Sequence, residues 1–139
     1  MSAEGKQIAV GVFCADWRLH QQSVNVVNML KEQLGVDGVD VLAVAGPEGV
    51  IMDPVRAGEK EGLKNNLNVL IGAHKPAMLA FVAHQQCAGY PASDEKHEQA
   101  IAQTAQEFKM LTNFAGPVVA LVATYAADDK WGLKEVARV

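Results

Sequence analysis

Cysteine is scarce in this sequence: of 139 residues, only Cys14 and Cys87 are cysteines. In a cytoplasmic protein, two such thiols are expected to stay reduced rather than form a disulfide. Two cysteines cannot complete a four-cysteine zinc site, so any metal site needs other types of ligand as well.

Long hydrophobic runs and basic clusters are also missing. No apolar run reaches the ~18 residues of a membrane span, and the start, MSAEGKQ, lacks the basic and apolar regions of a signal peptide. Charges of both signs are mixed along the chain, and the net charge is −4 with a pI of about 5.5. We therefore expect a cytoplasmic protein that binds neither nucleic acid nor membranes.

Hydrophobic residues are plentiful, at 50% of the chain. That share and the chain length are sufficient for one globular domain with a core of its own. No internal repeat, low-complexity segment or linker divides the sequence. We expect a single domain over residues 1–139, with residues 1–7 flexible.

The hydrophobic pattern alternates between strands and helices. Apolar runs predict buried strands at 8–13, 39–46, 77–83 and 116–127, and a short last strand at 131–139 that pairs as a hairpin. Helical spacing predicts helices at 19–34, 55–74 and 93–113, the last with a core stripe of Ile101, Ala105, Phe108 and Leu111. The stretch GPEG at 46–49 is predicted to be a loop. This alternation is typical of an α/β fold with a mainly parallel sheet.

Candidate reactive residues follow two of these strands. Cys14 stands at the carboxyl end of the first, and His84 and Cys87 follow the third. If the two strands are neighbours, the three side chains meet at one edge of the sheet. Two thiols and an imidazole suit zinc, and three protein ligands leave the open position of a catalytic site unless Asp16 fills it. The alternative is that each cysteine is a small buried hydrophobic residue.

The residues around these positions resemble the β-class carbonic anhydrases. CADWR at 14–18 is similar to that family's C-x-D-x-R motif, and HQQC at 84–87 is similar to its H-x-x-C motif. VLAVAG at 41–46 and VVALVATYAADDKWGLKEV at 118–136 resemble the family's second strand and last hairpin. The expected fold is therefore a mainly parallel four-stranded sheet of order 2-1-3-4, with helices on both faces and a short antiparallel C-terminal strand.

The resemblance also implies a function. Cys14, His84 and Cys87 would bind Zn²⁺, and zinc-bound hydroxide would add to carbon dioxide to give bicarbonate, which makes the protein a lyase (carbonate dehydratase). Asp16 and Arg18 would form the adjoining catalytic dyad, in which Arg18 holds Asp16 off the metal. Without this context, Asp16 and Arg18 are an exposed ion pair worth ~0–1 kcal/mol. The resemblance further implies a minimal form of the family that assembles as a homodimer or higher homo-oligomer.

Some positions depart from the family pattern and leave alternatives open. Ala88 stands before Gly89, where the family has glycine directly after its second cysteine. Gln85 and Gln86 are expected on a solvated face, and His20 is expected to face solvent rather than to shuttle protons. The alternative functions are a zinc hydrolase of carbon disulfide or carbonyl sulfide and a non-catalytic zinc-binding protein with Asp16 on the metal.

Overall fold

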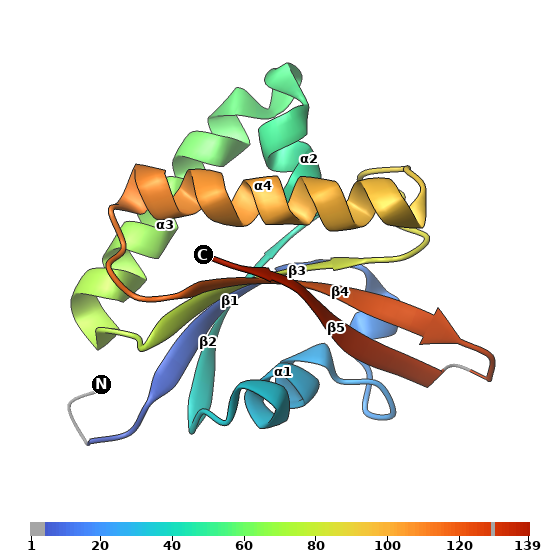
Figure 1. The fold of residues 1–139 in the computed structure, drawn as a ribbon, viewed down its shortest axis with the longest axis horizontal. Coiled ribbons are helices and arrows are strands. Elements are labelled where there is room, and N and C mark those ends of the chain that lie inside the picture. The colour runs from blue at the N-terminus through green and yellow to red at the C-terminus, as the bar shows by residue number, and fades with distance from the viewer. Residues whose placement is uncertain (1–4, 129) are drawn as a thin grey trace.

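The computed structural model of the chain describes residues 5–128 and 130–139 (Figure 1). The strands are β1 (Ile8–Cys14), β2 (Gly38–Val44), β3 (Met78–His84), β4 (Val118–Ala126) and β5 (Lys130–Arg138). The α-helices are α1 (Val26–Leu34), α2 (Pro47–Met52), α3 (Ala57–His74) and α4 (Asp94–Thr112). Short 3-10 helices cover Trp17–Leu19 and Pro54–Arg56.

The five strands form one sheet of order β2-β1-β3-β4-β5. The first four pair in parallel, and β5 pairs antiparallel to β4. This arrangement confirms the predicted fold class and strand order. The last strand lies one residue earlier than the expected 131–139 and has nine residues, as many as β4.

Helices cover both faces of the sheet: α1 lies on one side, and α2, α3 and α4 lie on the other (Figure 1). Side chains alternate between the two faces along each central strand, as the twofold period of a strand requires. In β3, Phe81 faces the helices α3 and α4, whereas Val82 faces α1. Phe81 also stacks on Phe108 of α4, with ring centroids 5.2 Å apart. The central strands are therefore buried on both faces, which explains their continuous apolar runs.

One predicted helix start and one predicted loop were wrong. The helix expected at 19–34 begins only at Val26, because the side chain of Asn25 accepts a hydrogen bond from Asn28 N and caps it there. The GPEG stretch expected to be a loop begins helix α2, with Pro47 in its first turn. Proline suits this position because its missing N–H has no partner in the first turn anyway.

The core stripe of α4 was predicted correctly except at its end. Ile101, Ala105 and Phe108 are fully buried, but Leu111 is 36% exposed. The buried face of the helix instead extends toward its N-terminus, where His97 is fully buried. The sequence pattern missed this residue because histidine does not register as a core position.

Two further expectations concern the termini and the membrane. Residues 1–4 of the segment expected to be flexible lie outside the described residues, and Gln7 N donates a hydrogen bond to Asp37 Oδ2 at 2.8 Å. Over the described ranges, no helix is both long and apolar enough to cross a membrane.

Candidate metal centre

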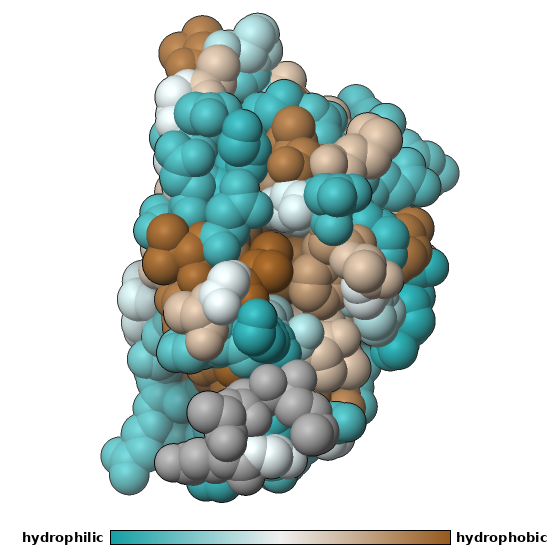
Figure 2. Space-filling model, turned by 90° about the vertical axis from the view of Figure 1, so that its left-hand side faces the viewer, coloured by the Kyte–Doolittle hydropathy of each residue, from teal (hydrophilic) through white to brown (hydrophobic). Residues whose placement is uncertain are grey.

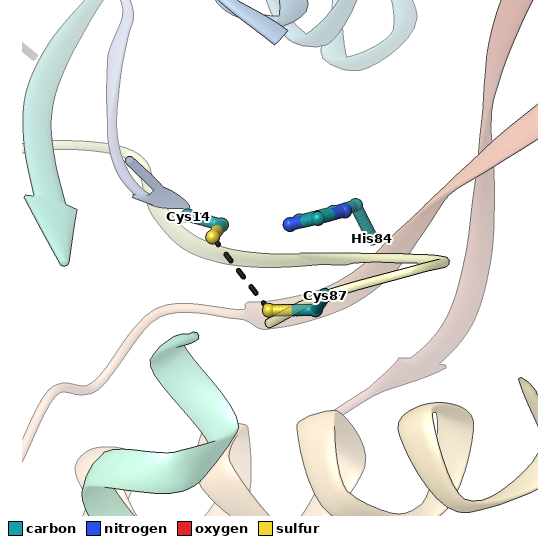
Figure 3. A group of neighbouring side chains, drawn as sticks. All are labelled: Cys14, His84 and Cys87. Carbon is teal, nitrogen blue, oxygen red and sulfur yellow. Dashed lines mark hydrogen bonds between the residues drawn. The ribbon is translucent and has the colours of Figure 1, made fainter. Parts of the chain in front are cut away.

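The three predicted ligands come together at the carboxyl edge of the sheet. Cys14 is the last residue of β1, His84 is the last residue of β3, and these two strands are parallel neighbours. Cys87 follows three residues after His84. Figure 3 shows the three side chains pointing toward one another. The convergence follows from topology, because neighbouring parallel strands end at the same edge.

The geometry of the group fits a zinc ion. The sulfurs of Cys14 and Cys87 are 3.8 Å apart, and the ligand atoms of all three residues lie within 4.8 Å of one another. Two sulfurs at ~2.3 Å from a tetrahedral zinc would be ~3.8 Å apart. All three side chains are buried, with 4% exposure or less.

The imidazole of His84 is oriented for coordination. Its Nδ1 donates a hydrogen bond to the Gln85 carbonyl at 2.6 Å, so the lone pair lies on Nε2. Nε2 is buried and has no hydrogen-bond partner among the described residues. A buried nitrogen without a partner is costly, and a metal ion would satisfy it.

The protonation states also favour a cation. The hydrogen bond from Cys87 holds the pKa of Cys14 far below its usual range, and the same contact, with burial, raises the pKa of Cys87. Burial lowers the pKa of His84, but the Cys14 sulfur, the Gln85 carbonyl and the Asp16 carboxylate together raise this pKa above its ordinary value. The Cys14 thiolate therefore forms readily, and its negative charge opposes ionisation of the Cys87 thiol. A divalent cation among the three removes that opposition.

A main-chain N–H group supports the sulfur of Cys14: Gly46 N donates to Cys14 Sγ at 3.3 Å. The Tyr90 main chain favours ionised Cys87 and partly offsets the rise in the pKa of that thiol. Gly46 has a φ of 62° and packs against Gly89. A Cβ added to Gly89 would lie 2.7 Å from the Ala45 carbonyl carbon. The glycine that follows Ala88 is therefore needed for this close contact between the two loops.

Asp16 and Arg18 lie beside the three ligands. Arg18 Nε donates to Asp16 Oδ1 at 3.0 Å, and Arg18 Nη2 donates to Asp16 Oδ2 at 2.8 Å. These hydrogen bonds lower the pKa of Asp16 to about 2, so the carboxyl group stays ionised near neutral pH. Asp16 Oδ2 is 3.7 Å from His84 Nε2. The contact is bidentate and partly buried, unlike a solvated surface ion pair.

Two residues that hold Arg18 were missed by sequence reasoning. Gln86 accepts from Arg18 through its side chain at 3.1 Å and through its main-chain carbonyl at 3.0 Å. The Trp131 ring of β5 lies 5.7 Å from the guanidinium carbon. Gln86 is exposed, as expected, whereas Gln85 is half-buried and its Oε1 accepts from Tyr125 N at 2.8 Å. No local pattern signals these contacts, since they depend on the turn at Gln86, whose φ is 60°.

A cavity of about 380 Å³ opens beside the sulfur of Cys14. It is lined by Asp16, by Trp17, which is 72% exposed, and by the small residues Ala15, Ala45, Ala88 and Gly89. His20 is exposed, as expected, and its Nε2 lies 2.8 Å from the Cys14 carbonyl oxygen. The cavity therefore adjoins the candidate metal position at Cys14.

The chain resembles known proteins in sequence and in fold. The sequence matches the family model described as "Putative carbonic anhydrase" over residues 4–137. No curated protein matches the sequence significantly.

Two solved structures have the same fold. A carbonic anhydrase from Streptococcus mutans has a TM-score of 0.59 and 16% identity, with 95% of this chain and 82% of that chain covered. A β-carbonic anhydrase, isoform I, from Trichomonas vaginalis has a TM-score of 0.57 and 15% identity, with 93% and 81% covered. At such identities, these two structures establish the fold alone.

Proposed function

The chain belongs to the family described as "Putative carbonic anhydrase", and from this premise we propose that it catalyses the zinc-dependent hydration of carbon dioxide to bicarbonate, as a member of the β-class whose fold it shares. One observation carries the proposal: two cysteine sulfurs and an unpartnered, buried imidazole nitrogen converge beside a carboxylate that an arginine holds. Cys14, His84 and Cys87 would bind the metal. Two thiolates and one imidazole are ligands that zinc prefers, and their number leaves one position open.

Zinc held there supplies a Lewis acid that lowers the pKa of water and makes hydroxide available near neutral pH. The chain's own residues orient that nucleophile. Asp16 is ionised and its Oδ2 lies 3.7 Å from His84 Nε2. Its carboxylate would accept a hydrogen bond from the attacking hydroxyl group, which would direct the oxygen lone pair toward the carbon of carbon dioxide.

Arg18 keeps Asp16 in this role. Its two side-chain hydrogen bonds occupy one lone pair on each carboxylate oxygen and fix the plane of the carboxylate. A carboxylate free to rotate would reach the fourth ligand position and exclude water. Gln86 and Trp131 hold the guanidinium from its other sides, so Arg18 itself has little freedom.

The cavity suits a small, neutral substrate. Its walls include Ala15, Ala45 and Ala88, which offer apolar surface and no side-chain charge. Carbon dioxide is linear and non-polar, so it loses little hydration on entering. Carbon disulfide and carbonyl sulfide share these properties, and the apolar lining makes a zinc hydrolase of these compounds the second candidate function.

The test combines metal analysis with activity. Purified protein should contain one zinc per chain and accelerate carbon dioxide hydration in a stopped-flow assay. Carbonyl sulfide and carbon disulfide are tested on the same preparation, and faster hydrolysis of either would favour the second candidate. One zinc per chain with no activity on any of the three would indicate the non-catalytic alternative.

We further propose a cytoplasmic homodimer. Both cysteines must stay reduced to bind metal, which fits the cytoplasm. Hydrophobic side chains interrupt the hydrophilic surface on the face that Figure 2 shows. Val41 on the edge strand β2 and Val69 on α3 are 48% and 67% exposed, which makes them candidate contacts. Sedimentation at micromolar concentration should show a dimer, and an active monomer would contradict the assignment.

A further inference from the structure

Behind the candidate metal centre lies a second buried polar pair that the proposed mechanism does not use. His97 Nδ1 donates a hydrogen bond to Glu48 Oε2 at 2.8 Å, and both side chains are fully buried. Glu48 Oε1 and His97 Nε2 have no hydrogen-bond partner within residues 5–128 and 130–139. The pair joins the first turns of α2 and α4, two helices that are far apart in sequence.

Stability alone does not account for this pair. Removing an acid and an imidazole from water is unfavourable, and apolar residues of similar volume at such positions are often neutral or stabilising. Each partner here also leaves one polar atom unsatisfied, which adds to the cost. In some proteins, buried polar pairs of this kind fix one conformation rather than add stability.

The location of the pair connects it to both ligand sulfurs. Glu48 is two residues from Gly46, whose N–H donates to Cys14 Sγ. The ring of His97 meets Tyr90 edge-on, with centroids 5.7 Å apart, and Tyr90 follows three residues after Cys87 in the same loop. The loop that carries Gly46 and the loop that carries Cys87 are thus each attached to one member of the pair.

The loops also touch each other directly. Gly89 and Gly46 pack so closely that a Cβ on Gly89 would lie 2.8 Å from Gly46 N. Neither glycine has a side chain that could fix the position of one loop against the other. The hydrogen bond between Glu48 and His97 holds the two helix ends on either side of it.

We infer that Glu48 and His97 are positioning residues for the metal site: their hydrogen bond holds the Gly46 N–H on the sulfur of Cys14 and keeps the Cys87–Tyr90 loop packed against the Gly46 loop. The inference rests on the proposed function, because it assumes that the two sulfurs bind zinc. Groups that orient ligands from outside the coordination shell affect metal affinity by about 10–100-fold. We expect an effect of that size when the pair is removed.

The experiment measures zinc affinity by competition with a chelator for four full-length variants. Glu48→Leu with His97→Phe removes the pair but keeps its volume. His97→Asn places an amide N–H near the position of Nδ1 and keeps the bond to Glu48, whereas His97→Gln moves the amide away. Phe108→Leu, on the same helix and far from the ligands, controls for general loss of stability.

We expect the double variant Glu48→Leu with His97→Phe to bind zinc about 10–100-fold more weakly than wild type. The melting temperature of its metal-free form should be unchanged or higher. His97→Asn should bind zinc more tightly than His97→Gln, and Phe108→Leu should have a lower melting temperature with wild-type zinc affinity. With Co²⁺ in place of zinc, the thiolate charge-transfer band should shift only in the variants that weaken binding.

Wild-type affinity and an unchanged Co²⁺ spectrum in the double variant would overturn the inference. If the double variant does not fold, the histidine variants decide: equal affinities for His97→Asn and His97→Gln would overturn it. A wild-type protein that binds no zinc would overturn both this inference and the proposed function. Zinc binding that is equal in wild type and variants would overturn the inference alone.

Discussion

Arg18 binds Asp16 through both carboxylate oxygens, from Nε to Oδ1 at 3.0 Å and from Nη2 to Oδ2 at 2.8 Å. The carboxylate lies beside the candidate ligand His84, with Oδ2 3.7 Å from its Nε2. An acidic side chain so close to a metal position is itself a potential ligand. Whether the site is open or closed therefore depends on Arg18.

Replacing Arg18 with alanine should close the site. Asp16 would then be free to take the fourth ligand position, so carbon dioxide hydration should fall by about 10²-fold or more while zinc stays bound. The measurements are the hydration rate and the zinc content. Arg138→Ala, which removes an exposed arginine paired with Glu135, is the matched control and should leave both unchanged. A fully active Arg18→Ala enzyme would refute the role of the dyad.

Trp131 should matter for activity through Arg18. Its ring lies 5.7 Å from the guanidinium and 6.1 Å from the His84 ring. Trp131→Leu removes a cation–π contact worth about 1 kcal/mol, so kcat/KM should fall by about fivefold. Trp131→Phe keeps an aromatic face and should retain more activity. Equal activities for the Leu and Phe variants would show that the ring's charge distribution is irrelevant.

The two residues after Cys87 should differ sharply in tolerance. In Gly89→Ala, the new Cβ would lie 2.7 Å from the Ala45 carbonyl carbon, so the loops must separate. We expect a loss of about 1–3 kcal/mol in the free energy of unfolding and weaker zinc binding. Ala88→Gly, at the adjacent exposed position, should cost only about 1 kcal/mol or less. Chemical denaturation and chelator competition measure the two effects, and equal losses would contradict the close contact.

Acid should remove a defined part of the stability of the metal-free protein. The hydrogen bonds from Arg18 lower the pKa of Asp16 from its ordinary 3.8 to about 2. The carboxylate therefore contributes stability above pH 4 that is lost as the pH falls through about 2. In Asp16→Asn, the free energy of unfolding should change by about 1–2 kcal/mol less between pH 5 and pH 2 than in wild type. Denaturation curves of wild type and Asp16→Asn, recorded at each pH with a chelator present, test this. An identical pH dependence in the two proteins would show that the Asp16–Arg18 pair contributes no stability.

The fold and the convergence of the three candidate ligands were predictable from the sequence because both depend on regular patterns. Buried parallel strands read as continuous apolar runs, and Cys14 and His84 each stand at the end of one. The contacts that surround the site were not predictable in the same way. Helix α2 has only six residues within a stretch of turn-forming residues, so Glu48 was placed in a loop.

The unpredicted partners are all distant in sequence. Glu48 and His97 are 49 positions apart, and Arg18 and Gln86 are 68 apart. Neither pair has a local signature such as a cap or a helical spacing. Gln86 reaches Arg18 only because its backbone adopts a positive φ between two ligands, a conformation that glutamine rarely signals.

The most direct test of the central claim is the rate of carbon dioxide hydration by protein that carries one zinc per chain, measured against pH. The account predicts a kcat/KM within the enzymatic range of about 10⁴–10⁸ M⁻¹s⁻¹ that rises toward alkaline pH. The substitution Cys14→Ser should abolish both zinc binding and the catalysed hydration of carbon dioxide. A fully zinc-loaded protein whose rate equals that of buffer at every pH would contradict the claim.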